Sequence, residues 1–262
     1  MLHKLSGEID FESAGLATRI PERGSESAKK SSRDFLVDAY EALGYETELH
    51  NFGGFWNKGV NVIAKKTTSK NAPTVILSSH YDSMDNKGAD DNGAVTIANL
   101  VIAKALRNID LDFNILFVAF DLEEKGLLGS KAYVKSLQKK GQLSNIAAVI
   151  NIEMLGYDSD NDGAIHVIHC NENSSKKLYD AYWKSTKKAK LKLVDVEACT
   201  NRSDHAPFWQ KNIPAIVLSQ NFFGGDGNPC YHKSCDDVSI INWNYINANT
   251  QAILNLVTSL KI

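Results

Sequence analysis

Four short hydrophobic runs in this chain each end in side chains of the kinds that bind metals or carry protons. The runs and the polar residues that follow them are 74–77 with His80 and Asp82, 115–120 with Glu123 and Glu124, 147–152 with Glu153, and 215–218 with Ser219 and Gln220. Runs of this length, rich in Val, Ile, Leu and Phe, are typical of buried strands in a parallel sheet. Ligands and catalytic groups gather beyond the carboxyl ends of such strands. The pattern therefore predicts a metallohydrolase site.

Length and composition predict one soluble α/β domain spanning residues 1–262. The 262 residues are 43% hydrophobic and 23% charged, which is ordinary for a globular protein with a sizeable core. A formal net charge of −2 gives no reason to expect a nucleic acid as partner. No apolar run approaches the roughly 20 residues that a membrane span needs, so we expect no membrane insertion.

The order of predicted elements places helices between strands. Residues 25–43 form an amphipathic stripe that predicts a helix ending at Gly44, and 46–52 and 60–66 alternate like two antiparallel edge strands. The next predicted strands are 74–79, 113–120, 146–152 and 215–218, and the other predicted helices are 93–107, 127–138, 174–187, 203–209 and 243–260. This order predicts a three-layer α/β/α sandwich over a mixed, centrally parallel sheet.

The strand ends supply paired polar residues that suit metal chemistry. His80 and Asp82 lie two apart, so both point to one face, and Asp82 can accept a hydrogen bond that orients a ligand histidine. Asp90 and Asp91 open the helix that follows, where acids usually cap a helix but can also bridge two cations. Glu123 and Glu124 are harder to explain structurally, because two adjacent buried carboxylates repel without a cation between them.

A late loop contributes the last candidates. Glu153 ends its strand as a possible oxygen ligand, and His232 follows Tyr231 between Cys230 and Cys235. Tyr231 can donate a hydrogen bond to an oxyanion or can simply be a packed loop residue. The two cysteines can form a small disulfide, which would imply an oxidising compartment, or remain two reduced thiols. Cys170 and Cys199 are interpreted as ordinary core or loop residues.

Six strings in fixed order resemble the co-catalytic di-zinc aminopeptidases, whose clan also contains glutamate carboxypeptidase and the glutaminyl cyclases. The strings are SSHYDS, GADDNG, AFDLEEKGLLGS, NIEMLGY, RSDHAPFW followed by IPAIVL, and YHKSCD. Each string alone is weakly specific, but the ordered set is highly specific and covers most of the chain.

The resemblance implies two zinc ions and a full set of site residues. His80, Asp90, Glu124, Glu153 and His232 match the metal ligands of that family, and Asp90 matches the carboxylate that bridges the ions. It also implies that Glu123 is the general acid/base, that the peptide bond between Asp90 and Asp91 is cis, and that Tyr231 stabilises an oxyanion. The cysteine spacing resembles that of the secreted bacterial members and favours the disulfide. Many members carry Asp where this chain has Glu153, so occupancy of the second metal site is the weakest part of the match.

These observations predict an aminopeptidase that hydrolyses peptides with a free N-terminus. A single-zinc glutaminyl cyclase is the first alternative, although cyclases tend to have a different residue after the first aspartate. A binding domain that has lost its chemistry is the second alternative, and it is disfavoured because every ligand and the base are present. We expect a monomer that is secreted or periplasmic, its leader replaced by Met1; a cytoplasmic location stays open because the start of the chain lacks an apolar signal region.

Two segments keep alternative interpretations. The segment 203–205, Ser-Asp-His, is either a wall of the substrate pocket or a structural hydrogen-bond network. The segment 158–163 has the D-x-D-x-D-G form of a calcium loop, but position twelve is His169 instead of Glu, which excludes an EF-hand. A tight hairpin turn between two strands is the favoured interpretation, with a calcium site as the lesser one.

Overall fold

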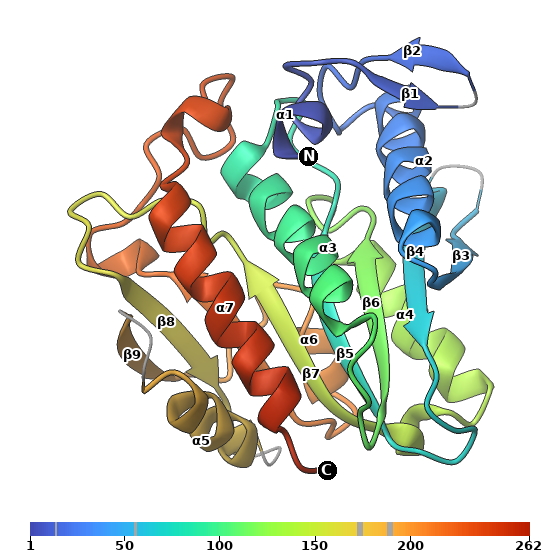
Figure 1. The fold of residues 1–262 in the computed structure, drawn as a ribbon, viewed down its shortest axis with the longest axis vertical. Coiled ribbons are helices and arrows are strands. Elements are labelled where there is room, and N and C mark those ends of the chain that lie inside the picture. Colours follow the sequence, from blue (N-terminus) through green and yellow to red (C-terminus); the bar gives the residue numbers. More distant parts are fainter. Residues whose placement is uncertain (14, 55–56, 172–174, 188–190) are drawn as a thin grey trace.

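The fold is organised around one eight-stranded sheet (Figure 1). The computed structural model describes residues 1–13, 15–54, 57–171, 175–187 and 191–262. The strands lie in the order β3-β4-β6-β5-β7-β10-β8-β9, and their bounds are β3 Glu46–Phe52, β4 Gly59–Lys66, β5 Thr74–His80, β6 Asn114–Phe120, β7 Ile146–Glu153, β8 Ala164–His169, β9 Lys192–Glu197 and β10 Ala215–Gln220. The central strands β6, β5, β7 and β10 are parallel, whereas β3, β4 and β8 add antiparallel pairs.

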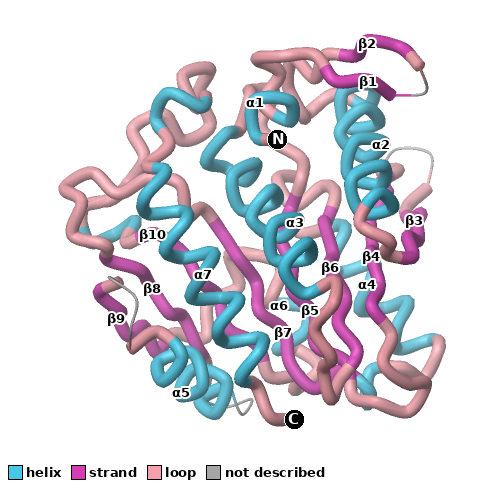
Figure 2. The backbone as a smooth tube through the Cα atoms, in the orientation of Figure 1, coloured by secondary structure: helices cyan, strands magenta, loops and turns pink. Residues whose placement is uncertain are grey.

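Helices cover both faces of the sheet, as Figures 1 and 2 show. Their bounds are α1 Leu2–Leu5, α2 Glu26–Ala42, α3 Ala94–Leu106, α4 Leu128–Lys139, α5 Ser175–Ser185, α6 Ala206–Trp209 and α7 Trp243–Ser259. Helices α2, α3, α5 and α7 lie on one face, and α4 and α6 lie on the other. A short hairpin, β1 Phe11–Ser13 and β2 Leu16–Thr18, stands apart from the main sheet. The predicted three-layer sandwich is confirmed.

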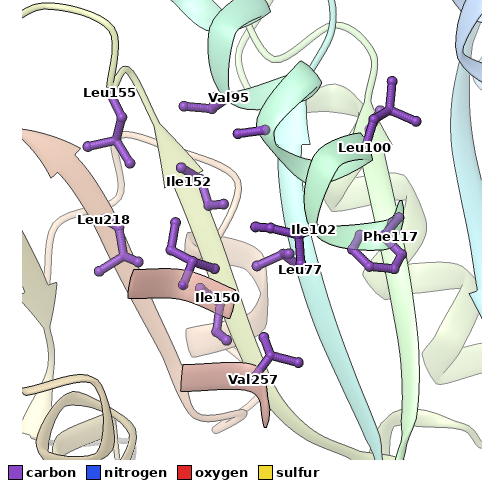
Figure 3. Packing of buried hydrophobic residues seen from close by; sticks show 14 of the residues in the cluster. Leu77, Val95, Leu100, Ile102, Phe117, Ile150, Ile152, Leu155, Leu218 and Val257 are labelled. Carbon is purple, nitrogen blue, oxygen red and sulfur yellow. The ribbon is translucent and has the colours of Figure 1, made fainter. Parts of the chain in front are cut away.

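Alternate residues of each central strand feed two separate cores. Leu77 of β5 and Ile150 of β7 pack under α3 and α7, as the close view in Figure 3 shows, whereas Ile76 and Val149 pack toward α4 and α6. This period of two follows from the pleat of a strand. Because both faces are covered, the central strands β5, β6, β7 and β10 are largely apolar, and most of their polar side chains lie toward their carboxyl ends.

Most predicted elements are confirmed to within three residues at their ends. Ser25 caps α2, since its side chain accepts a hydrogen bond from Ala28 N at 3.4 Å, and Asn242 caps α7 in the same way. The predicted start of α5 at Ser174 lies outside the described residues. The sequence prediction missed β8 and β9, which are short and carry His166, His169 and Asp195 among their apolar residues.

The predicted hairpin around residues 158–163 is wrong. β7 and β8 do not pair with each other, because β10 lies between them, parallel to β7 and antiparallel to β8. The segment therefore connects two strands that are not neighbours, and it passes across the end of the sheet. The residues around 158–163 do not show that β10, which comes about 50 residues later, lies between β7 and β8. For that reason the sequence pattern favoured a simple hairpin turn.

Candidate metal centre

Five side chains from five places in the chain converge at the carboxyl ends of the central strands. His80 ends β5, Glu153 ends β7 and Glu124 follows β6. Asp91 lies in the distorted turn Ala89–Gly93 that leads into α3, and His232 lies in the loop after β10. They form two groups of potential ligands, His80 with Asp91 and Glu153, and Asp91 with Glu124 and His232; within each group the ligand atoms lie within 4.8 Å of one another. The fold thus brings together two adjacent groups of candidate ligands, which include four of the five residues that the sequence predicted, His80, Glu124, Glu153 and His232.

Asp91 belongs to both groups through its two oxygens. Its Oδ1 lies 3.2 Å from His80 Nε2, and its Oδ2 lies 3.2 Å from His232 Nε2. Glu153 Oε1 lies 3.2 Å from His80 Nε2, and Glu124 Oε2 lies 3.1 Å from His232 Nε2. This is the geometry in which one carboxylate can bridge two cations.

The prediction that Asp90 is the bridging ligand is wrong in position by one residue. The side chain of Asp90 points away from both groups: Oδ1 accepts from Gly156 N at 2.8 Å, and Oδ2 accepts from the side-chain amides of Gln220 and Asn228 at 3.0 and 2.9 Å. Its oxygens are therefore already satisfied by protein donors. The cis peptide bond also lies one residue later than predicted, between Asp91 and Asn92.

The backbone that presents Asp91 is held by two buried charged residues that the sequence prediction did not single out. Asp236 accepts from Asp90 N at 2.8 Å and from Asp91 N at 3.1 Å. The fully buried guanidinium of Arg23 donates to the carbonyl oxygens of Leu5, Tyr81, Lys87, Gly88 and Asp91. Their sequence neighbourhoods carry no motif of their own, apart from the final letter of YHKSCD for Asp236.

Asp82 connects His80 to the glutamate pair. Its two carboxylate oxygens accept from the backbone N–H groups of Glu123 and Glu124, both at 3.2 Å. His80 Nδ1 lies 3.1 Å from the backbone oxygen of Asp82 and 3.5 Å from its carboxylate. The predicted orientation of His80 by Asp82 is thus made mainly through the carbonyl, while the carboxylate fixes the turn after β6.

The segment 203–205 contributes a hydrogen-bond network behind Glu153. Ser203 Oγ donates to Glu153 Oε2 at 2.7 Å and accepts from Asn151 Nδ2 at 2.8 Å, and Ser78 Oγ donates to Asn151 Oδ1 at 2.7 Å. Within this segment, Ser203 takes part in a structural network, and the alternative of a substrate-pocket wall stays a prediction. The network orients the longer glutamate side chain at this position.

Burial and neighbouring charges shift the pKa values of several side chains in the site. Burial, together with the neighbouring charges of Glu153, Asp204 and Asp82, raises the pKa of Glu123 to about 10. Burial and the charge of Asp91 raise the pKa of Glu124 to about 8. Burial opposes the charge of His80, but Glu153, Asp82 and Asp91 outweigh that effect and raise its pKa well above the usual value.

The donor set fits divalent cations such as zinc. Each group offers one imidazole nitrogen and carboxylate oxygens, the ligand types that zinc accepts. Glu124 Oε1 is buried and has no hydrogen-bond donor among the described residues. A cation beside it would supply the missing partner and would favour the ionised forms of Glu123 and Glu124.

A disulfide frames the second group. Cys230 and Cys235 are bonded, which confirms the predicted small loop around Tyr231 and His232. The Tyr231 ring stacks on the His232 ring with centroids 3.7 Å apart, and 37% of Tyr231 remains exposed. Cys170 and Cys199 form a second disulfide, so their interpretation as ordinary core or loop residues is wrong. Their pairing joins the end of β8 to the loop before Ser203, two segments whose proximity only the fold creates.

Comparison with known proteins identifies the family. The family model of peptidase family M28 matches residues 61–257, well over half of the chain. The chain belongs to peptidase family M28.

This M28 chain spans about half the length of the curated relatives that it matches. It is 30% identical to aminopeptidase YwaD of Bacillus subtilis over 223 residues, which cover 82% of this chain and 46% of the relative. It is 28% identical to leupeptin-inactivating enzyme 1 of Streptomyces exfoliatus over 252 residues, which cover 88% of this chain and 55% of that enzyme.

Solved structures share the fold of this M28 chain. BSAP, a zinc aminopeptidase from Bacillus subtilis, superposes with a TM-score of 0.69 at 26% identity, covering 78% of this chain and 50% of BSAP. A glutaminyl cyclase from Bacteroides thetaiotaomicron superposes with a TM-score of 0.77 at 18% identity, covering 92% of this chain and 94% of the cyclase, a likeness of fold alone. Among the described residues, no helix is both long and apolar enough to cross a membrane.

Proposed function

We propose that this protein is a zinc-dependent aminopeptidase that removes N-terminal residues from peptides. The proposal rests on the position of Asp91. Each of its two carboxylate oxygens faces one of the two groups of candidate ligands, and each group contains a histidine and another carboxylate. A carboxylate placed in this way suits two adjacent ions. Family membership and the aminopeptidase names of its relatives support the same activity.

In this proposal, His80, Asp91 and Glu153 hold one zinc, and Asp91, Glu124 and His232 hold the other. Bound zinc supplies Lewis acidity toward a peptide carbonyl and lowers the pKa of water to about 7. Asp82 and Ser203 keep His80 and Glu153 oriented through the contacts described above. His80 and Glu153 sit on strand ends that the packed sheet makes rigid.

Glu123 is the proposed general acid and base. It follows β6 beside the ligand Glu124, its backbone N–H is fixed by Asp82, and its carboxyl group is largely buried among the site charges. It takes a proton from the attacking water and returns it to the leaving amine. Tyr231, partly exposed above His232, donates its hydroxyl proton in a hydrogen bond to the developing oxyanion.

The wider setting belongs to the same proposal. Two disulfides support an oxidising compartment, such as the outside of the cell or the periplasm. We propose that residues 1–262 work as one catalytic domain and as a monomer, with peptides bearing a free N-terminus as substrates.

The test is a mass-spectrometric digest of mixed peptides by the zinc-loaded protein. The set contains several free N-termini, N-acetylated copies and peptides that begin with glutamine. Stepwise loss of residues from free N-termini alone is the expected result. Loss of ammonia confined to the glutamine peptides would instead assign a glutaminyl cyclase, and an unchanged peptide set would remove both activities.

The variant Glu123→Gln tests the proposed base directly. Turnover should fall by a factor on the order of 10²–10⁴, the usual contribution of general acid–base catalysis, because the amide cannot accept the proton. Zinc content, measured by atomic emission, should stay near that of the parent protein. Glu197→Gln, a matched change at an exposed position of β9, should leave turnover unchanged. Full activity in Glu123→Gln would exclude the role.

A further inference from the structure

A second acidic group lies away from the metal centre, over the end of the sheet. Asp158, Asp160 and Asp162 come from the connection between β7 and β8, and Asp226 comes from the loop after β10. Each offers a carboxylate oxygen, and these atoms lie within 4.8 Å of one another. The connection that resembles a calcium loop thus meets a fourth carboxylate from more than 60 residues later in the chain.

The side chain of Asp158 gives a second, separate indication that an ion binds here. The residue is 8% exposed, and its Oδ2 accepts from Gly163 N at 3.3 Å. Its Oδ1 is buried and has no hydrogen-bond partner in the described part of the chain. Leaving a buried carboxylate oxygen unpaired is costly, so such an atom commonly faces an ion or a water.

The charges around Asp158 point to a cation. Burial raises its pKa, and the charges of Asp226, Asp162 and Asp160 raise it further. Lys192 Nζ pairs with Asp162 Oδ2 at 2.8 Å from the exposed side. Within the described ranges, that ion pair is the only one that involves these four carboxylates, so most of their negative charge is uncompensated.

The ligand chemistry selects a hard cation. The group offers only oxygen, with no imidazole or thiolate, which suits Ca²⁺ better than the zinc chemistry of the first site. Calcium also tolerates irregular geometry and fills its coordination sphere with carbonyl oxygens and water. We propose that Asp158, Asp160, Asp162 and Asp226 form a calcium site, a proposal that does not rest on the peptidase activity. It is not an EF-hand, since Asp226 supplies the distant carboxylate in place of a twelfth-position glutamate.

Such an ion would tie the β7–β8 connection to the loop that leads to the metal centre. Asp226 Oδ1 already accepts from Ser159 N and Ser159 Oγ, both at 2.8 Å. The backbone oxygen of Asp226 accepts from Gln220 Nε2 at 3.2 Å, and Gln220 and Asn228 hold Asp90. Bound calcium would therefore stabilise the native state. It would also restrain the residues that hold Asp90, next to the bridging Asp91.

Equilibrium dialysis with ⁴⁵Ca²⁺ and thermal unfolding of the zinc-loaded protein test this site. We expect one bound calcium ion per chain and a Tm that rises with CaCl₂ more than with MgCl₂ at equal ionic strength. Asp160→Asn, at an exposed position, should weaken calcium binding by roughly tenfold or more, because one ligand charge is lost. Asp112→Asn, a change of the same charge at another exposed position, should bind calcium like the parent protein.

Three outcomes would overturn the proposed calcium site. One is no calcium binding at about 10 mM, well above the weakest protein calcium sites. Another is an equal rise in Tm with magnesium and calcium, and a third is parental calcium affinity in Asp160→Asn. Peptidase turnover of Asp160→Asn at saturating zinc is measured alongside, so that failure of the calcium site is distinguished from failure of the proposed enzyme.

Discussion

At the residue scale, two adjacent aspartates have opposite surroundings. Asp91 faces the histidines of both ligand groups, whereas Asp90 accepts three hydrogen bonds from Gly156, Gln220 and Asn228. Asp91 can therefore bind ions, whereas Asp90 can hold the loop that presents Asp91. Residue type alone does not separate these roles, because both are buried acids in the same turn.

Replacing each aspartate by asparagine should separate the two roles. Asp91→Asn should lose bound zinc and most turnover, because the amide supplies one weaker oxygen where two charged oxygens are needed. Asp90→Asn should keep its zinc but unfold more readily, by about 1–3 kcal/mol, since an amide N–H₂ would face hydrogen-bond donors. Zinc stoichiometry and urea unfolding measure both effects. Zinc loss in Asp90→Asn with retention in Asp91→Asn would reverse the assignment.

At the element scale, two disulfides fix two different connections. Cys230–Cys235 closes a loop with a sequence separation of 5 around a candidate ligand, whereas Cys170–Cys199 spans 29 residues between β8 and the loop before Ser203. Loop-closure entropy makes the longer crosslink the more stabilising one. The shorter one instead restricts the position of His232.

Removing each disulfide should therefore have a different effect. The double variant Cys170→Ser/Cys199→Ser should lose about 3.5 kcal/mol of stability and the variant Cys230→Ser/Cys235→Ser about 2 kcal/mol, from the chain-entropy relation. The second variant should lose more zinc affinity, because His232 is freed. Urea unfolding and zinc titration with a chelator buffer measure the two quantities. Equal zinc affinity in both double variants would show that the small loop does not position His232.

At the scale of the whole molecule, the N-terminal segment reaches the centre of the site. Arg23 precedes the part of the chain that the family model matches, yet its buried guanidinium binds carbonyl oxygens on both sides of the loop that ends in Asp91. Several hydrogen bonds depend on the planar fork of a guanidinium, which an ammonium group does not reproduce. Folding of the first residues and assembly of the metal centre are therefore linked.

Arg23→Lys should test this link. Stability should fall by about 2–4 kcal/mol because several buried carbonyl oxygens lose their donor, and zinc affinity should fall because the loop before Asp91 is less restrained. Arg19→Lys, at an exposed ion pair with Asp10, is the matched control and should change neither quantity by more than about 0.5 kcal/mol. Unchanged unfolding of Arg23→Lys would show that lysine satisfies the same carbonyl groups.

The sequence by itself determined the strands of the sheet other than β8 and β9, the helices between them and the chemistry at the strand ends. These features are local, since a buried strand needs an apolar run and a ligand needs a particular functional group. Motifs therefore predict His80, Glu124, Glu153 and His232 as ligands, and the structure brings these four side chains together.

Only the tertiary structure decided features that depend on how distant segments meet. It placed Asp91 rather than Asp90 between the two ligand groups, inserted β10 between β7 and β8, and joined Cys170 to Cys199. It also buried Arg23 under the site. The physical reason is that the direction of a side chain in a distorted turn, and the neighbour of a strand, are set by packing against residues far away in the chain.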